Sequence, residues 1–233
     1  GLAGQGHIGR INISNAFYCV WGRDGLNPIA GQPQKIRAQM AAIELSYDRD
    51  WARFRVSWFW ASGDSDPDDQ HAEGFDAIFD NPNFAGGEFS YWQRQSIRLF
   101  GVGLTQRQSL LPNLRSSKTQ GQSNFVNPGL SLVNAGIDMD LTPKLKLIAN
   151  ANFLWFDTTR SLEVFTFQDR IRREIGTDLS LGLEYRPYLN DNVQLVTGLS
   201  TFIPGDGFQD LYNPLGGTVD TLFGHFLEVT LTY

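Results

Sequence analysis

The sequence predicts an all-β protein, an antiparallel transmembrane β-barrel with at least eight strands of about ten residues. Three observations support this prediction. Apolar residues recur at every second position, short turns alternate with long connections, and the C-terminal segment carries an apolar row that ends on an aromatic residue. Together they indicate a sheet with one side suited to lipid and one side suited to water.

The period of two is clearest in four segments, in which one row of alternate residues is apolar and the other is mixed and largely polar. In 51–61 the apolar row is Phe54, Val56, Trp58 and Trp60; in 131–141 it is Val133, Ala135, Ile137, Met139 and Leu141. In 145–156 it is Leu145, Leu147, Ala149, Ala151, Phe153 and Trp155; in 178–186 it is Leu179, Leu181, Leu183 and Tyr185. Segments 10–22, 37–47, 193–203 and 222–233 follow the same pattern less regularly. Because successive side chains of a strand point to opposite faces, these eight segments are predicted strands.

The connections between these strands alternate between short and long. The short ones carry tight-turn residues and lie at 48–50, 142–144 and 187–192. The long ones lie at 23–36, 63–129, 157–176 and 204–221. A transmembrane barrel has this pattern, with short periplasmic turns on one side and longer outer loops on the other.

The C-terminal segment resembles the assembly signal of bacterial outer-membrane barrels, which is a terminal aromatic residue preceded by apolar residues at every second position. Leu227, Val229, Leu231 and Tyr233 carry this resemblance. Aromatic residues also fall near both ends of the predicted strands, where interfacial rings are favoured. We expect Tyr47, Trp51, Tyr185 and Tyr233 at the periplasmic rim, and Trp21, Trp60, Trp155 and Phe223 at the outer rim.

Composition excludes several other classes of protein. The chain has 233 residues and a net charge of −6, which argues against a nucleic-acid-binding protein with its basic face. Its one cysteine, Cys19, excludes an internal disulfide and a cysteine zinc site. A soluble β-sandwich or a lipocalin-like barrel is the alternative with period-two strands. It is disfavoured because the polar row carries too many charges for a packed core.

Four stretches resemble a group of largely uncharacterised bacterial outer-membrane proteins related to alginate-export-like porins. They are 6–18, 44–51, 79–87 and 125–130. The resemblance implies a bacterial outer-membrane location and places these stretches in the C-terminal half of a barrel about twice as long, with about 16 strands. Residues 1–233 would then be the C-terminal portion of that barrel. A self-contained eight-stranded barrel, filled by its own side chains, is the alternative.

The predicted function is a porin-like channel for passive or weakly selective passage of polar or charged solutes. The polar row would line the pore, with Arg53, Arg55, Asp138, Asp140, Lys146, Asn150, Asn152, Glu184 and Arg186. The alternative is a structural or interaction barrel whose lumen is plugged by the loop 63–129 or by a partner protein. We expect contacts with outer-membrane lipid, lipopolysaccharide and the barrel-assembly machinery; a homo-oligomer is left open, and no cofactor is predicted.

The loop 63–129, extracellular or folded into the lumen, separates its charges. Residues 64–88 hold eight acids and no Lys or Arg, whereas 94–118 hold five bases and no acid. A loop folded into the pore would set a transverse field, with Asp64, Asp66, Asp68, Asp76, Arg94 and Arg98 as the candidate constriction residues. The alternative is two solvated segments that pair with each other.

Other candidate sites are weaker. The acidic run 64–69 fails the EF-hand pattern, because its sixth and twelfth positions are Asp69 and Phe75, so no metal site is predicted. No Gly-x-Ser-x-Gly motif accompanies the three histidines, which argues against an enzyme. The basic loop 157–176 would contact lipopolysaccharide phosphates or an anionic substrate, or else pair locally with Glu163, Asp169 and Glu174. Its bases are Arg160, Arg170, Arg172 and Arg173.

Overall fold

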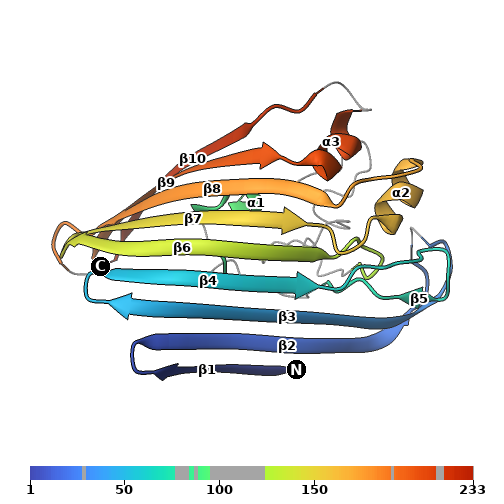
Figure 1. Cartoon of the computed structure of the whole chain (residues 1–233), viewed down its shortest axis with the longest axis horizontal. Coiled ribbons are helices and arrows are strands. Elements are labelled where there is room, and N and C mark those ends of the chain that lie inside the picture. The colour runs from blue at the N-terminus through green and yellow to red at the C-terminus, as the bar shows by residue number, and fades with distance from the viewer. Residues whose placement is uncertain are drawn as a thin grey trace.

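The computed structural model describes residues 1–27, 30–76, 84–86, 89–94, 124–189, 192–213 and 218–232. Ten strands form one sheet, and nine of them are antiparallel to their neighbours and follow one another in chain order (Figure 1). The nine are β1 (Leu2–Ile8), β2 (Ile11–Asp24), β3 (Gln34–Arg49), β4 (Ala52–Ala61), β6 (Leu130–Thr142), β7 (Leu145–Trp155), β8 (Glu174–Tyr185), β9 (Val193–Pro204) and β10 (Leu222–Leu231). The short β5 (His71–Ala72) pairs in parallel with β3. The predicted all-β antiparallel fold and all eight predicted strands are therefore confirmed.

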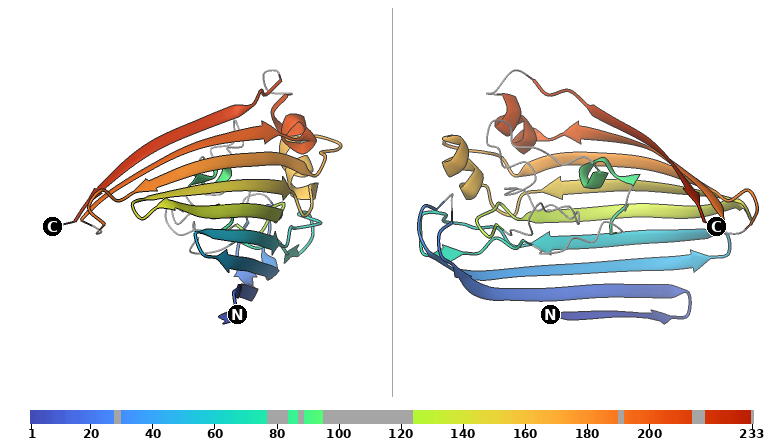
Figure 2. Two further views of the ribbon diagram at one scale, coloured as in Figure 1. Left: turned by 60° about the vertical axis from the view of Figure 1, so that its left-hand side comes forward. Right: turned by 180° about the vertical axis from the view of Figure 1, so that it is seen from behind.

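β1 was not predicted, because its glycines hide the alternation of side chains. It joins β2 through the two-residue turn Gly9-Arg10, in which Gly9 adopts a φ of 61° that a residue with a side chain rarely takes. β1 pairs with residues 11–17 of β2. Among the described residues no pairing joins β1 to β10, so the strands form a curved, open sheet (Figure 2). Closure into a barrel stays a prediction.

Short turns and long connections alternate as predicted. The turns after β1, β3, β6 and β8 gather at one end of the sheet, and the longer connections gather at the other (Figure 1). We call these the turn end and the loop end. Three short helices lie in the described parts of the long connections: α1 (Tyr91–Arg94), α2 (Arg160–Thr166) and α3 (Asp206–Tyr212). They were missed because one or two helical turns carry too little periodicity to detect. None of the helices in the described part of the chain is long and apolar enough to span a membrane.

The register gives the sheet two distinct faces. The inner face is the one that bears Arg55 and Ser57, and the segment formed by residues 84–86 and 89–92 packs against it (Figure 2, right). The outer face carries the predicted apolar rows, and many of their large side chains are exposed. They include Ile11, Phe17, Trp21, Ile43, Leu45, Tyr47, Phe54, Val56, Trp58, Val133, Phe153, Trp155, Leu179, Leu181, Tyr185, Leu199, Ile203, Phe223, Leu227, Val229 and Leu231.

The inner face is polar only toward the turn end. Along β4 the inward residues change from Arg53 and Arg55, through Ser57, to the buried Phe59 and Ala61 at the loop end. The main core lies there, beneath the long connections. Its members include Leu132, Leu154, Phe156, Leu162, Phe202, Phe208 and Leu211. The expectation of a largely polar inner row thus holds for the turn-end half alone, because the loop-end half is covered by chain and excluded from water.

Candidate functional site: the polar inner face

The predicted pore-lining residues occupy one surface. Eight of the nine lie on β4, β6, β7 and β8, and the register directs them all to the inner face. Arg53 is the cross-strand partner of Asp138, and Lys146 lies between Asp140 and Glu184. Arg186 follows β8 in the turn, where its backbone N–H donates to the carbonyl of Lys144. Whether this surface lines a pore stays a prediction.

An ion pair organises the middle of this surface. Nη2 of Arg55 donates to Oδ1 of Asp138 at 2.8 Å and to Oδ1 of Asn150 at 3.0 Å. The two charged side chains are 12% and 15% exposed. Gly136 provides the room, because a Cβ there would lie 2.6 Å from the Asn150 amide oxygen. By contrast, the Arg53–Asp48 pair nearer the turn end has side chains that are 50% and 41% exposed.

A row of polar side chains, all buried except the half-buried Glu44, crosses the inner face between the core and the polar half. Ser57 Oγ donates to Oε2 of Glu44 at 2.7 Å and lies 3.5 Å from Oδ1 of Asn134. Nδ2 of Asn134 donates to Oδ1 of Asn152 at 2.7 Å, and Asn152 is the cross-strand partner of Asp178. Hydrogen bonding across four strands offsets the cost of burying these groups. Of this row only Asn152 was predicted as a site residue, although the alternation in 37–47 could have indicated Glu44.

Part of the long connection is held on the inner face by Asp178. Its Oδ2 accepts a hydrogen bond from the backbone N–H of Trp92 at 2.7 Å. Nearby, Phe89 packs on Ile148, Val196 and Phe226. Residues 89–92 are therefore attached to the wall formed by β7 to β10, which is the arrangement that a loop folded against the inner face requires.

Phe89 rests on two glycines of the inner face. A Cβ built on Gly182 would lie 2.2 Å from the Phe89 ring, and one built on Gly198 would lie 2.3 Å from the Phe226 ring and 3.0 Å from the Phe89 ring. The Phe89 ring therefore occupies the space that a side chain would need at Gly182, and it shares that space with the Phe226 ring at Gly198. We call Gly182 and Gly198 the glycine socket.

Among the candidate constriction residues, the structure describes the side chains of the four acids. Asp64, Asp66 and Asp68 lie in the connection that leads to β5 at the loop end, where the backbone N–H of Asp64 donates to the carbonyl of Asn127. Oδ2 of Asp76 accepts from the backbone N–H of Asn124 at 2.7 Å. Arg94 ends α1, and Arg98 lies outside the described residues. The proposed opposition of acids and bases across a pore stays a prediction.

Asp64 should make the loop end sensitive to pH. It is 1% exposed, and burial raises its carboxyl pKa to about 7, with repulsion from Asp69, Glu73 and Asp66 adding to the effect. Because its pKa in the unfolded chain is near 3.8, the contribution of Asp64 to stability is fully present below that pH. This contribution is lost as the pH rises through about 7.

Asp64→Asn should therefore stabilise the protein more at pH 8 than at pH 5, as thermal unfolding midpoints at the two pH values would record. Asp68→Asn, an exposed change in the same connection, is the control. Equal effects of Asp64→Asn at both pH values would contradict the assignment.

The basic loop is largely paired within the protein. Arg172 forms two hydrogen bonds to Asp210, at 2.9 and 2.7 Å, and an ion pair with Asp206 at 2.6 Å, which ties this loop to α3. The bonds from Arg172 hold the pKa of the Asp210 carboxyl below its usual value. Arg160 pairs with Glu163, and Arg173 with Asp157. Local pairing, which the sequence left open, thus accounts for three of the four bases, although the partners differ from Asp169 and Glu174.

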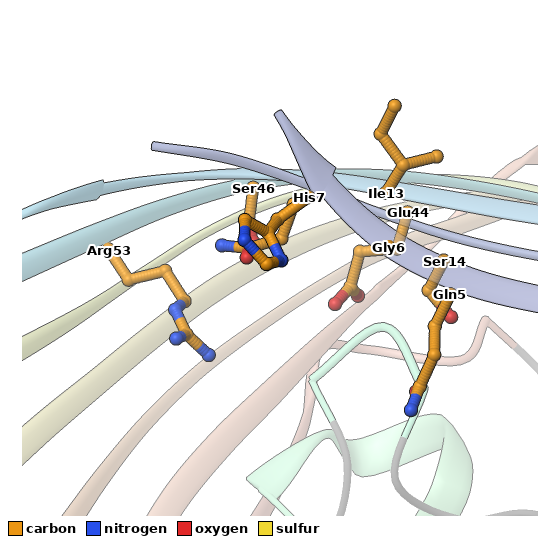
Figure 3. A pocket seen from close by; sticks show the side chains of 9 residues that line it. Gln5, Gly6, His7, Ile13, Ser14, Glu44, Ser46 and Arg53 are labelled. Carbon is orange, nitrogen blue, oxygen red and sulfur yellow. The ribbon is translucent and has the colours of Figure 1, made fainter. Parts of the chain in front are cut away.

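A recess opens on the inner face of β1 to β4. Its volume is about 440 Å³, and it is lined by Gln5, Gly6, His7, Asn12, Ile13, Ser14, Glu44, Ser46 and Arg53. Figure 3 shows the Arg53, Glu44 and Gln5 side chains on the side of the sheet that faces the segment around α1, and Ile13 pointing to the opposite side. The recess is therefore lined almost wholly by groups that form hydrogen bonds. His7 was not predicted here, because β1 was not recognised as a strand.

The other histidines and the acids form no evident metal site. His71 lies 3.4 Å from Asp69, and His225 is on the outer face, 3.3 Å from the hydroxyl of Thr197. Within the described ranges, no three His, Cys, Asp or Glu side chains are arranged as metal ligands.

Comparison with known proteins gives a distant structural similarity. No protein-family model matches the chain, and no curated protein matches it. Fifteen chains of solved structures match it in shape, among them the crystal structure of the Ralstonia pickettii toluene transporter TbuX, with a TM-score of 0.33 and 10% sequence identity. The alignment covers 97% of this chain and 60% of the transporter. The chain thus spans about three fifths of the length of that protein.

Proposed function

We propose that this chain forms part of the wall of an outer-membrane β-barrel, through which polar or charged solutes pass. The outer face carries this proposal. Its exposed apolar side chains run across the sheet from β2 to β10, whereas soluble monomers rarely expose a contiguous apolar patch of more than several hundred Å². Lipid is the environment in which such a face is stable.

Aromatic residues support this orientation in the membrane. Trp60 and Trp155 flank Ser131 in the register near the loop end, and Tyr47 and Tyr185 lie near the turn end. Two aromatic belts at the ends of an apolar band are typical of outer-membrane barrels, because the rings favour the interface between lipid and water. The turn end would then face the periplasm.

The inner face supports passage of polar solutes. Its turn-end half carries ion-paired and hydrogen-bonded side chains, together with an open recess. The same proposal includes a barrel of about 16 strands and a relation to alginate-export-like porins. It also includes contacts with lipopolysaccharide and with the barrel-assembly machinery. The segment attached by Phe89 favours the alternative of a lumen plugged by the protein's own loop.

A charge on the outer face should hinder insertion far more than a charge on the inner face. Leu227, which is 65% exposed, and Glu228 are neighbours on β10 with opposite orientations. We expect Leu227→Arg to destabilise the inserted protein by about 2–4 kcal/mol if it lies near the bilayer midplane. Glu228→Arg should cost much less. Folding into lipid vesicles at increasing denaturant measures both, and equal losses would contradict the proposed orientation.

Conductance across a planar bilayer tests the transport function. Stable ohmic steps are expected for the folded barrel that contains this chain, as for an open polar lumen. Their absence in protein that has inserted and folded would overturn the channel proposal and favour the plugged barrel. Unchanged conductance after deletion of 64–118 would overturn the proposed constriction.

A further inference from the structure

The recess on β1 to β4 is lined by one carboxylate, Glu44, and one cation, Arg53. Glu44 accepts a hydrogen bond from Ser57 Oγ at 2.7 Å and forms no ion pair in the part of the chain that the structure describes. Arg53 lies within electrostatic range of Glu44, but its charge and that of Arg55 are each balanced by another carboxylate. Arg53 pairs with Asp48, and Arg55 pairs with Asp138. The uncompensated charge in the recess is therefore negative.

The other lining groups add acceptors around that charge. Gln5 and Ser14 are cross-strand partners on the inner face, and Ser14 is in turn the partner of Glu44, so the three follow one another across β1, β2 and β3 (Figure 3). An amide oxygen, a hydroxyl and a carboxylate thus lie in one row. A group with several N–H donors could bind all three.

We propose that this recess binds the primary ammonium group of polar solutes, with Glu44 as the residue that determines specificity. An ammonium group is a compact point charge with three donors, whereas a guanidinium group favours two oxygens of one free carboxylate. One Glu44 oxygen already accepts a hydrogen bond from Ser57 Oγ. An ammonium group, which needs one oxygen, therefore fits better than a guanidinium group, which favours two. The inference rests on the proposed function, because the solute must reach the inner face.

Putrescine, a four-carbon diamine, is a suitable probe. Calorimetric titration of the full folded chain in detergent, at pH 7.5 and low salt, should detect binding that Glu44→Gln weakens at least tenfold. Glu228→Gln removes a carboxylate from the inner face of β10, outside the recess, and should leave the affinity unchanged. Ser57→Ala keeps the charge and frees the second oxygen, so binding should persist. Circular dichroism would verify that each variant is folded.

Several outcomes would overturn the inference. They are the absence of putrescine binding to the folded wild-type chain, equal affinity in Glu44→Gln, or tighter binding of glutarate, a dicarboxylate that would point to Arg53 and His7 instead. These outcomes differ from failure of the proposed function, because binding in detergent does not require conduction. A chain that conducts but does not bind putrescine would refute the ammonium site and leave the channel intact.

Discussion

Arg55→Ala is expected to lower the free energy of unfolding by about 3–5 kcal/mol, because it leaves the carboxylate of Asp138 shielded from water and without its cation. The side chains of the pair are 12% and 15% exposed, and Asn150 loses the same donor. Unfolding by urea of the chain refolded into detergent or lipid, followed by tryptophan fluorescence, measures the loss.

The sheet offers a matched control for this pair on the same strand. Arg53 and Asp48 form an ion pair whose side chains are 50% and 41% exposed, and exposed pairs contribute about 0–1 kcal/mol. Arg53→Ala should therefore cost much less than Arg55→Ala. In the double variant Arg55→Ala/Asp138→Ala, the loss should be smaller than the sum of the two single losses, because neither charge remains unpaired. Equal losses for Arg53→Ala and Arg55→Ala would refute the assignment.

Gly182→Val is expected to detach residues 89–92 from the inner face. The new Cβ would lie 2.2 Å from the Phe89 ring, and overpacking of this kind costs about 1–3 kcal/mol. Displacement of the ring is the way to relieve the clash, because Gly182 is on a paired strand. Faster proteolysis of the long connection should follow, together with increased conductance if the segment narrows a pore.

Two further variants distinguish a specific clash from a general loss of strand stability. Gly6→Val introduces the same residue on β1, where nothing lies within 4 Å of the new Cβ, and should leave proteolysis unchanged. Phe89→Ala removes the ring that lies over Gly182, so adding Gly182→Val to it should cause little further change. If Gly182→Val had the same effect with and without the Phe89 ring, the contact between Phe89 and Gly182 would not be what attaches the segment.

The period-two pattern was sufficient to predict the strands, their faces and the alternation of connections. These are local properties, since the direction of each side chain follows from its position along its own strand. The pattern failed where apolar and polar residues do not alternate. β1 is rich in glycine, and the inner row near the loop end is apolar like the outer row.

The sequence by itself therefore determined that this protein is an antiparallel sheet with an apolar outer face and short turns at one end. Only the tertiary structure decided which inner side chains meet. Arg55 binds Asn150 from 95 positions away, and Trp92 binds Asp178 from 86 positions away. Such contacts depend on the register of several strands and on the return of a long connection to the sheet. The physical reason is that hydrogen bonds and ion pairs are decided by distances in space, which a local pattern of hydrophobicity does not specify.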